Sequence, residues 1–190
     1  MTEGLVEEGE IIGIADTGLD RGSITTILDD FKGQVAKGYI KGIFSKGWED
    51  PQGHGTHTAG SILSTGVSSG GKLRGGAYAG KLVVEGLWSP MLNNISISPD
   101  FDDLFGKVRR DDNVHIHSNS WGSQNLGAYD NFASLVDEVS WNHPDLLLVF
   151  AAGNSGQDLN KDGRIDEGSV SSPGTAKNCL TVGASKNLVA

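Results

Sequence analysis

The chain has 190 residues, a length that suits one domain or most of one. Its hydrophobic content of 37% is enough for a core, and no low-complexity tract or long block of like charge argues for disorder. The formal net charge of −9, without a basic stripe, makes nucleic acid and anionic membranes poor partners. No stretch approaches the roughly 18–20 apolar residues of a membrane span.

The start of the chain bears on the compartment, whereas its single cysteine says little about it. Thr2-Glu3-Gly4 follows Met1 without an apolar stretch, so we expect no signal peptide within the chain. The protein is then either cytosolic or was made with a leader that has been removed. Cys179 cannot form an intrachain disulfide and lies in an apolar run, which favours a buried core thiol over a nucleophile.

Short apolar runs alternate with helical patterns along the chain. The expected strands are residues 11–15, 81–87, 114–117, 146–151 and 178–182. The expected helices are residues 54–63, 99–110 and 129–141. The strand runs are nearly continuously apolar, as in a parallel sheet covered on both faces. The sequence therefore predicts an α/β fold, a doubly wound and mainly parallel sheet with helices on both faces and ligands at the carboxyl ends of its strands.

Three polar residues lie where this architecture places active sites. Asp16 ends the first expected strand, His54 opens the first helix after a glycine turn, and Asn154 follows the strand that ends at Ala151. Each has an ordinary interpretation when taken alone, because Asp and Asn are common in turns and a His at a helix start can be structural. Their joint occurrence is more informative than any one of them.

The segments around these residues resemble signature motifs of the subtilisin-like serine proteases, the subtilases. The matching segments are Asp16-Thr17-Gly18, Gly53-His54-Gly55-Thr56-His57, Ala151-Ala152-Gly153-Asn154 and Ser118-Asn119-Ser120-Trp121-Gly122. The chain order of Asp before His agrees with that family. The resemblance runs from about Gly9 to Ala184, and it implies that residues 1–190 are the N-terminal two-thirds of a peptidase domain, incomplete at the C-terminus.

The resemblance implies a role for each matching residue. His54 would be the general base, Asp16 would orient its imidazole, and Asn154 would donate its side-chain amide to the oxyanion. By the same resemblance, two short segments would form opposite walls of the substrate cleft. They are Ser120-Trp121-Gly122 and Ala152-Gly153. For the Trp121 side chain, ordinary packing is the alternative.

Two histidine pairs raise the question of a catalytic metal. His57 lies three residues after His54, and His115 and His117 form a second pair. The zinc-protease pattern His-Glu-x-x-His is absent, because Gly55 stands where Glu is needed. We therefore expect no catalytic metal, and the resemblance implies a structural role for His57.

An acidic stretch at residues 158–167 predicts a structural calcium site. Oxygen-bearing side chains alternate before Gly163, which is how a short loop surrounds a hard cation. The expected ligands are Asp158, Asn160, Asp162, the Arg164 carbonyl, Asp166 and Glu167. The loop is only EF-hand-like, since Ser169 stands where the EF-hand has its last Glu. A solvated acidic turn is the alternative, and some subtilases place such a loop after the oxyanion Asn.

The nucleophile motif of the family, of the type Gly-Thr-Ser-Met-Ala, does not occur in the chain. The nearest string, Gly174-Thr175-Ala176, has no serine, so we expect the nucleophile beyond Ala190. The resemblance implies a secreted endopeptidase that acts on proteins or peptides. The chain alone would be inactive and would need its C-terminal remainder, or another copy, to cover its core. The alternatives are an inactive pseudoprotease that binds peptides and calcium, and a calcium-binding module of another class.

Overall fold

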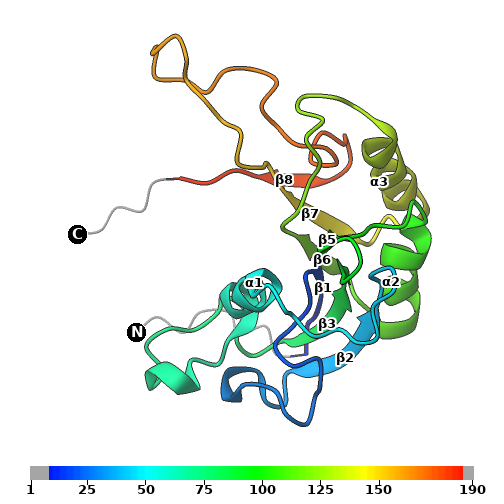
Figure 1. Cartoon of the computed structure of the whole chain (residues 1–190), viewed down its shortest axis with the longest axis vertical. Coiled ribbons are helices and arrows are strands. Elements are labelled where there is room, and N and C mark those ends of the chain that lie inside the picture. The colour runs from blue at the N-terminus through cyan, green and yellow to red at the C-terminus, as the bar shows by residue number, and fades with distance from the viewer. Residues whose placement is uncertain (1–8, 186–190) are drawn as a thin grey trace. The chain divides into compact units, whose positions relative to one another are not determined.

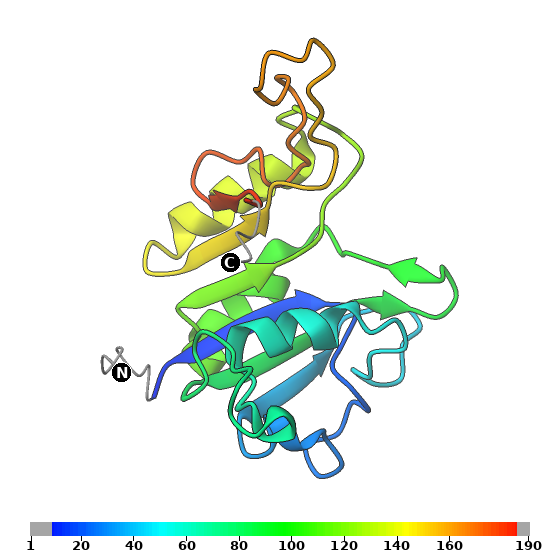
Figure 2. The same ribbon diagram turned by 90° about the vertical axis from the view of Figure 1, so that its left-hand side faces the viewer.

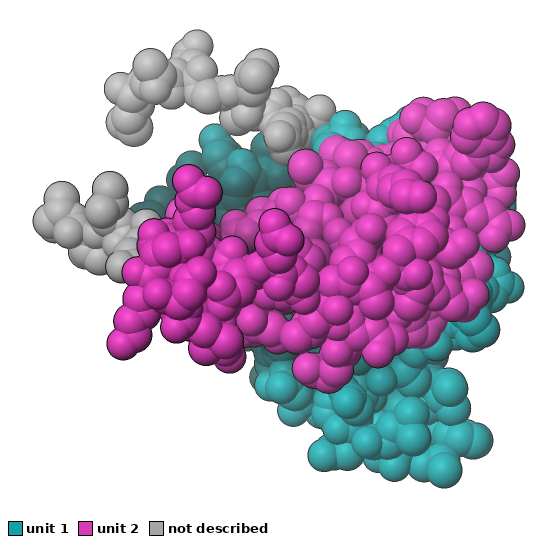
Figure 3. All heavy atoms as spheres, turned by 90° about the horizontal axis from the view of Figure 1, so that it is seen from above, with its two compact units in different colours: residues 1–118 teal, residues 119–190 magenta. Residues whose placement is uncertain are grey.

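The protein is described from a computed structural model, which covers residues 9–185. The chain divides between Ser118 and Asn119 into two compact units, coloured separately in Figure 3. Every pairing among the long strands is parallel, and helices pack on the sheet, so the predicted α/β class is confirmed.

Four parallel strands form the sheet of the first unit, in the order β2-β3-β1-β6. They are β1 (Ile11–Asp16), β2 (Val35–Ile40), β3 (Lys81–Gly86) and β6 (Ile116–Asn119), whose last residue belongs to the second unit. β1 is central, with Ile12 opposite both Leu82 of β3 and Ile116 of β6. A short antiparallel hairpin, β4 (Trp88–Ser89) and β5 (Asn94–Ile95), follows β3.

Helices cover opposite faces of this sheet, as Figures 1 and 2 show. On one face α1 (His54–Leu63) places Ala59 and Leu63 in a core with Ile14 and Leu82. The other face carries η3, a π-helical turn (Asp102–Gly106), and α2 (Lys107–Asp112). Two short 3-10 turns complete the unit, η1 (Asp29–Phe31) and η2 (Val67–Ser69). The helix predicted at 99–110 is thus found with a π-helical first part.

A buried polar pair lies beneath η3. His117 Nε2 is 2.9 Å from Glu85 Oε2, and both side chains are fully buried. Gly13 of β1 makes room for the imidazole, since an added Cβ would come within 2.3 Å of its Cδ2. Burial raises the pKa of Glu85, although the His117 hydrogen bond and the Lys41 charge oppose this rise. Lys41 Nζ is 3.7 Å from Glu85 Oε1.

The second unit contains β7 (Leu147–Ala151), β8 (Leu180–Val182) and α3 (Asn131–Asn142). β7 pairs in parallel with β8, and α3 packs on β7. Asp130 caps α3 by accepting hydrogen bonds from the backbone amides of Phe132 and Ala133.

Some details of the second unit depart from the sequence prediction. The strand expected at 178–182 is shorter, and Leu180 and Val182 are each 50% exposed rather than buried. Cys179 is half-buried, and its Sγ is 3.4 Å from Thr181 Oγ1. The prediction of a buried core thiol was therefore wrong. The apolar run at 178–182 predicts a strand, but it does not show whether that strand lies in the centre of the sheet or is the last one described.

In the first unit, too, the burial of a strand depends on its place in the sheet. β2 was not predicted, because it is an edge strand of which only Val35 is buried, so it lacks a continuous apolar run. Within residues 9–185, no helix has the length and apolar character needed to cross a membrane.

The Glu85–His117 pair predicts a distinctive pH dependence of stability. Because the pKa of Glu85 is raised in the fold, the folded protein holds this proton more tightly than the unfolded chain. The contribution of Glu85 to stability is therefore complete below its ordinary pKa of 4.5 and falls as the pH rises toward the raised value. Glu85→Gln removes this loss of stability. In the wild type the loss is about 1.4 kcal/mol for each pH unit between 4.5 and the raised pKa.

Urea unfolding of both proteins at a series of pH values measures the effect. We expect the free energy of unfolding of the variant, relative to that of the wild type, to increase as the pH rises above 4.5. A difference that stays constant with pH would contradict the raised pKa.

Candidate active site

Two of the predicted catalytic residues lie together in the first unit. Asp16 is the last residue of β1, and His54 is the first of α1. His54 Nδ1 is 2.7 Å from Asp16 Oδ1, which also accepts a hydrogen bond from the backbone amide of Thr17. The side chain of Asp16 is 4% exposed, whereas that of His54 is 47% exposed. A buried carboxylate therefore holds the Nδ1 side of an accessible imidazole.

The glycines around His54 have a structural reason. Gly53 precedes the helix with φ of 90°, a conformation that other residues rarely adopt. A Cβ on Gly55 would lie 2.2 Å from the Gly18 carbonyl oxygen. Gly53 thus permits the turn into α1, and Gly55 lets the start of the helix approach the segment after β1.

Asp50, which the sequence analysis did not single out, organises the start of α1. Its Oδ1 accepts hydrogen bonds from Thr17 Oγ1 at 2.7 Å and from the Gly53 amide at 2.8 Å. Its Oδ2 accepts from the amide and the hydroxyl of Thr56, at 2.8 and 2.7 Å. Burial opposes ionisation, but these hydrogen bonds outweigh it and lower the pKa of Asp50. An acid just before a predicted helix start was the available signal.

Asn154, the predicted oxyanion donor, belongs to the second unit. It follows β7 and the turn at Gly153, whose φ is 99°. Asn154 is exposed and lines an open cavity of about 410 Å³ together with Ser155, Gln157 and Asp166. The side-chain amide of Asn154 is therefore accessible to a ligand.

Both predicted walls of the cleft lie against the same residue of the second unit, Ser171. A Cβ on Gly122 would lie 2.8 Å from Ser171 Cβ, and one on Gly153 would lie 2.3 Å from Ser171 Oγ. The backbone of Ala152 pairs with Ser171, whose amide donates to its carbonyl at 2.9 Å. Ser171 itself is 7% exposed. Its position was not predicted, because Ser171 is far from both walls along the chain.

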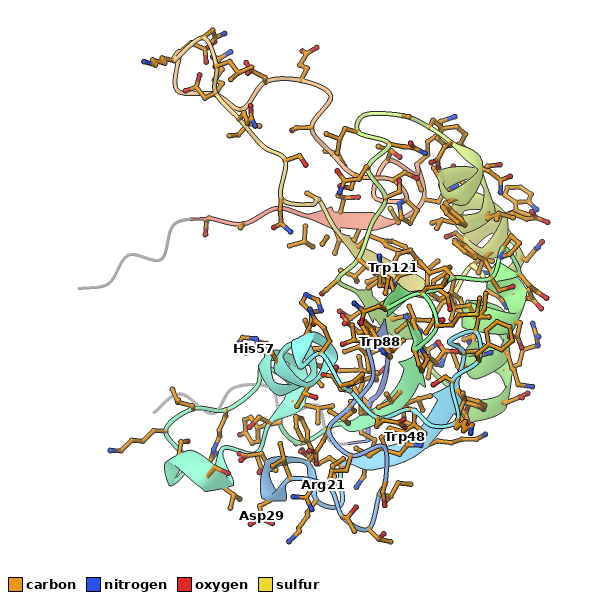
Figure 4. The ribbon with its side chains drawn as sticks, viewed as in Figure 1. Arg21, Asp29, Trp48, His57, Trp88 and Trp121 are labelled. Carbon is orange, nitrogen blue, oxygen red and sulfur yellow. The ribbon has the colours of Figure 1, made fainter. Side chains whose placement is uncertain are left out.

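The side chains of the first predicted wall are not equivalent. Trp121, labelled in Figure 4, is 8% exposed and stacks edge-to-face on Phe150, with ring centroids 5.3 Å apart. Its indole is thus engaged in packing, so contact with a ligand at this wall falls to the backbone. Ser120 is half-buried and Gly122 is exposed.

The loop at 158–167 is folded around its own acidic side chains. Asp158 accepts hydrogen bonds from the amides of Asp162 and Gly163, at 3.0 Å each. Asp162 Oδ1 accepts from the Arg164 amide, and Asp166 Oδ2 from the Leu159 amide, both at 2.9 Å.

The remaining expected ligands differ in what they contact. Asn160 Oδ1 accepts from the Asp162 amide, whereas Glu167 borders the same cavity as Asn154. In the described part of the chain, no three His, Cys, Asp or Glu side chains are grouped so that they could hold a metal ion. The loop supplies oxygens of the right chemical class for calcium, but its carboxylates are not gathered around one point.

The second histidine of the helix motif is separate from the pair made by Asp16 and His54. His57 is exposed and points outward from α1 in Figure 4. His117 is paired with Glu85 in the core of the first unit. Neither therefore extends the pair made by Asp16 and His54.

Comparison with known proteins gives a consistent result. The subtilase family matches residues 7–189. The chain is 32% identical over 194 residues to "Serine protease/ABC transporter B family protein tagA" of Dictyostelium discoideum, covering 96% of this chain and 10% of that protein. It is 32% identical over 144 residues to "Serine protease AprX" of Bacillus subtilis, covering 71% of this chain and 30% of that protein.

Solved structures agree on the fold. Sphericase is 25% identical with a TM-score of 0.63, and the match covers 92% of this chain and 53% of that one. The S41 psychrophilic protease is 23% identical with a TM-score of 0.65, over 92% of this chain and 52% of that one. The chain thus spans about a tenth of the first relative and about half of these solved structures. On the strength of the family match and the identity to named serine proteases, the chain belongs to the subtilase family of serine-type peptidases.

Proposed function

We propose that this chain supplies the base, its orienting acid and an oxyanion donor to a serine endopeptidase that hydrolyses peptide bonds in proteins or peptides. The observation that carries the proposal is the 2.7 Å contact between the buried Asp16 carboxylate and the accessible His54 imidazole. A structural histidine would not need its partner buried and its own ring open to solvent. Membership of the subtilase family supports the same reaction class.

In the proposed reaction, His54 Nε2 takes the proton of a serine hydroxyl as the oxygen attacks the scissile carbonyl. Asp16, hydrogen-bonded to Nδ1, stabilises the imidazolium that forms, and His54 then protonates the leaving amine. The Asn154 amide donates to the oxyanion of the tetrahedral intermediate. Removing one such donor typically costs about 10²–10³ in kcat.

The serine of this proposal lies beyond residue 190, in a remaining part of the peptidase domain. The half-exposed Leu180 and Val182 of β8 support a covering partner, because an edge strand with exposed apolar side chains is a site of association. The remainder of the domain, or another copy, would provide that cover. We further propose that the protein is secreted, as subtilases often are.

Covalent labelling tests the role of His54. The full-length protein should react with a fluorophosphonate probe at a serine outside this chain, as mass spectrometry of the denatured polypeptides would show. His54→Ala should abolish labelling, because the serine loses its base. The matched control is His57→Ala, which removes an exposed imidazole three residues along the same helix and should leave labelling intact.

Other outcomes separate the alternatives. A folded full-length protein that binds peptides but is not labelled would be the inactive pseudoprotease. Labelling of residues 1–190 themselves would place the nucleophile within this chain and overturn the proposed location of the serine.

A second part of the proposal is that residues 158–167 bind a structural calcium ion. The oxygens of Asp158, Asn160, Asp162 and Asp166 and the Arg164 carbonyl would be ligands, with Glu167 as the acid nearest the end of the loop. The amide hydrogen bonds to Asp158 and Asp162 support this, because they already curl the backbone around these carboxylates. Calcium would supply the charge that draws the acidic side chains together.

Thermal unfolding tests the calcium site. Adding calcium to EDTA-stripped protein should raise the melting temperature, because an ion that binds only the folded state stabilises it. Asp158→Asn with Asp162→Asn should remove most of that rise. Glu138→Gln, which neutralises an exposed acid on α3, is the matched control and should retain it. Equal melting temperatures with and without calcium in the wild type would rule the site out.

A further inference from the structure

The two catalytic residues of the first unit come from segments that are far apart in the chain. Asp16 ends β1, whereas His54 starts α1, and the direct side-chain link between them is one hydrogen bond of 2.7 Å. His54 is 47% exposed, so packing holds its ring only in part. The geometry of the pair then depends on how firmly the start of α1 is attached to the end of β1.

One carboxylate takes part in that attachment on both sides. Asp50 Oδ1 accepts from the hydroxyl of Thr17, the residue next to Asp16, and from the amide of Gly53, the residue next to His54. The Thr17 hydroxyl in turn accepts from the Gly55 amide at 2.8 Å. The neighbours on both sides of His54 and the neighbour of Asp16 are therefore joined through two linked side chains, those of Asp50 and Thr17.

Asp50 is also held from its other oxygen. Thr56 donates both its amide and its hydroxyl to Oδ2, and Thr56 Oγ1 accepts from the Asp20 amide at 2.8 Å. The backbone amide of Asp50 donates to the Asp20 carbonyl at 2.9 Å. These bonds fix the carboxylate relative to the segment that follows β1, and hydrogen bonds to an ionised acceptor are the stronger kind.

We infer that Asp50 is a positioning residue of the reaction: it fixes the imidazole of His54 against Asp16 by tying the first turn of α1 to the end of β1. The inference rests on the proposed function, since it assigns Asp50 a part in the activity of His54. Asp50 does not itself contact the reacting atoms and acts only through His54.

The substitution Asp50→Asn is a sharp test because it keeps the size and removes one acceptor. The new amide group must face either the Thr56 amide or the Gly53 amide, and two donors then oppose each other. The control is Asp30→Asn, which disturbs the other end of the same helix. Asp30 accepts from Ser64 Oγ at 3.0 Å, just after the last residue of α1.

Two readouts in the full-length protein decide the inference. Asp50→Asn should lower kcat by about 10- to 100-fold with little change in KM, because the base is misplaced while the cleft is intact. The low-field proton resonance of the His54 Nδ1–H···Asp16 bond should be lost in Asp50→Asn. Both readings should stay near those of the wild type in Asp30→Asn.

A milder pair of variants covers the case in which Asp50→Asn fails to fold. Thr17→Val removes the hydroxyl that links Asp50 to the Gly55 amide, and Thr17→Ser restores it. Activity and the resonance should fall in Thr17→Val and recover in Thr17→Ser. Equal losses in Asp50→Asn and Asp30→Asn, or a retained resonance in both Asp50→Asn and Thr17→Val, would overturn the inference.

The resonance keeps this test separate from that of the proposed function. A wild type that shows the resonance but has no peptidase activity would contradict the proposed function. The change of that resonance in the variants would still decide whether Asp50 positions His54.

Discussion

The central position of β1, paired in parallel with β3 on one side and β6 on the other, is the constraint on which the first unit depends. A strand held from both sides has little freedom, so the residue at its carboxyl end is placed accurately. Asp16 occupies that end and is buried there. Because the Asp16 carboxylate is already fixed, only the His54 imidazole has to be positioned to form the contact.

The same strand imposes conditions on its neighbours. Gly13 lacks a side chain where the buried His117 ring lies against β1, and Gly55 lacks one where α1 meets the Gly18 carbonyl. Close approach at these two places lets the His117 ring of β6 lie against β1 and the start of α1 lie against the segment that follows it. A larger residue at Gly55 would push the start of α1 away from that segment, because cores have few voids to absorb the displacement.

Polar groups in this unit serve two different ends. Glu85 and His117 are fully buried and hydrogen-bonded to each other, so their contact bears on stability and its pH dependence. Asp50 is only partly buried and is surrounded by donors, so it stays ionised and organises the start of α1. Both use a carboxylate to join two segments, but only the second lies next to the residues proposed for catalysis.

The acidic loop of the second unit shows how local chemistry and binding are related. Its carboxylates already accept amide hydrogen bonds, which shape the backbone without any ion. A cation would have to compete with, or add to, these bonds. The loop also shares a cavity with Asn154, so its order bears on the surroundings of the proposed oxyanion donor.

The sequence by itself determined the α/β class, the main strands and helices, and the family, because apolar runs report burial and the motifs around Asp16, His54 and Asn154 are local patterns. It could not show β2 as an edge strand or β8 as half-exposed, since exposure depends on which strands lie alongside. The contacts of Asp50 and Ser171 were likewise decided only by tertiary structure. Asp50 meets Thr17 across 33 positions of the chain, and Ser171 meets Gly122 and Gly153 from a separate segment. Such contacts arise from chain segments that fold back on one another, and no local pattern of residues encodes them.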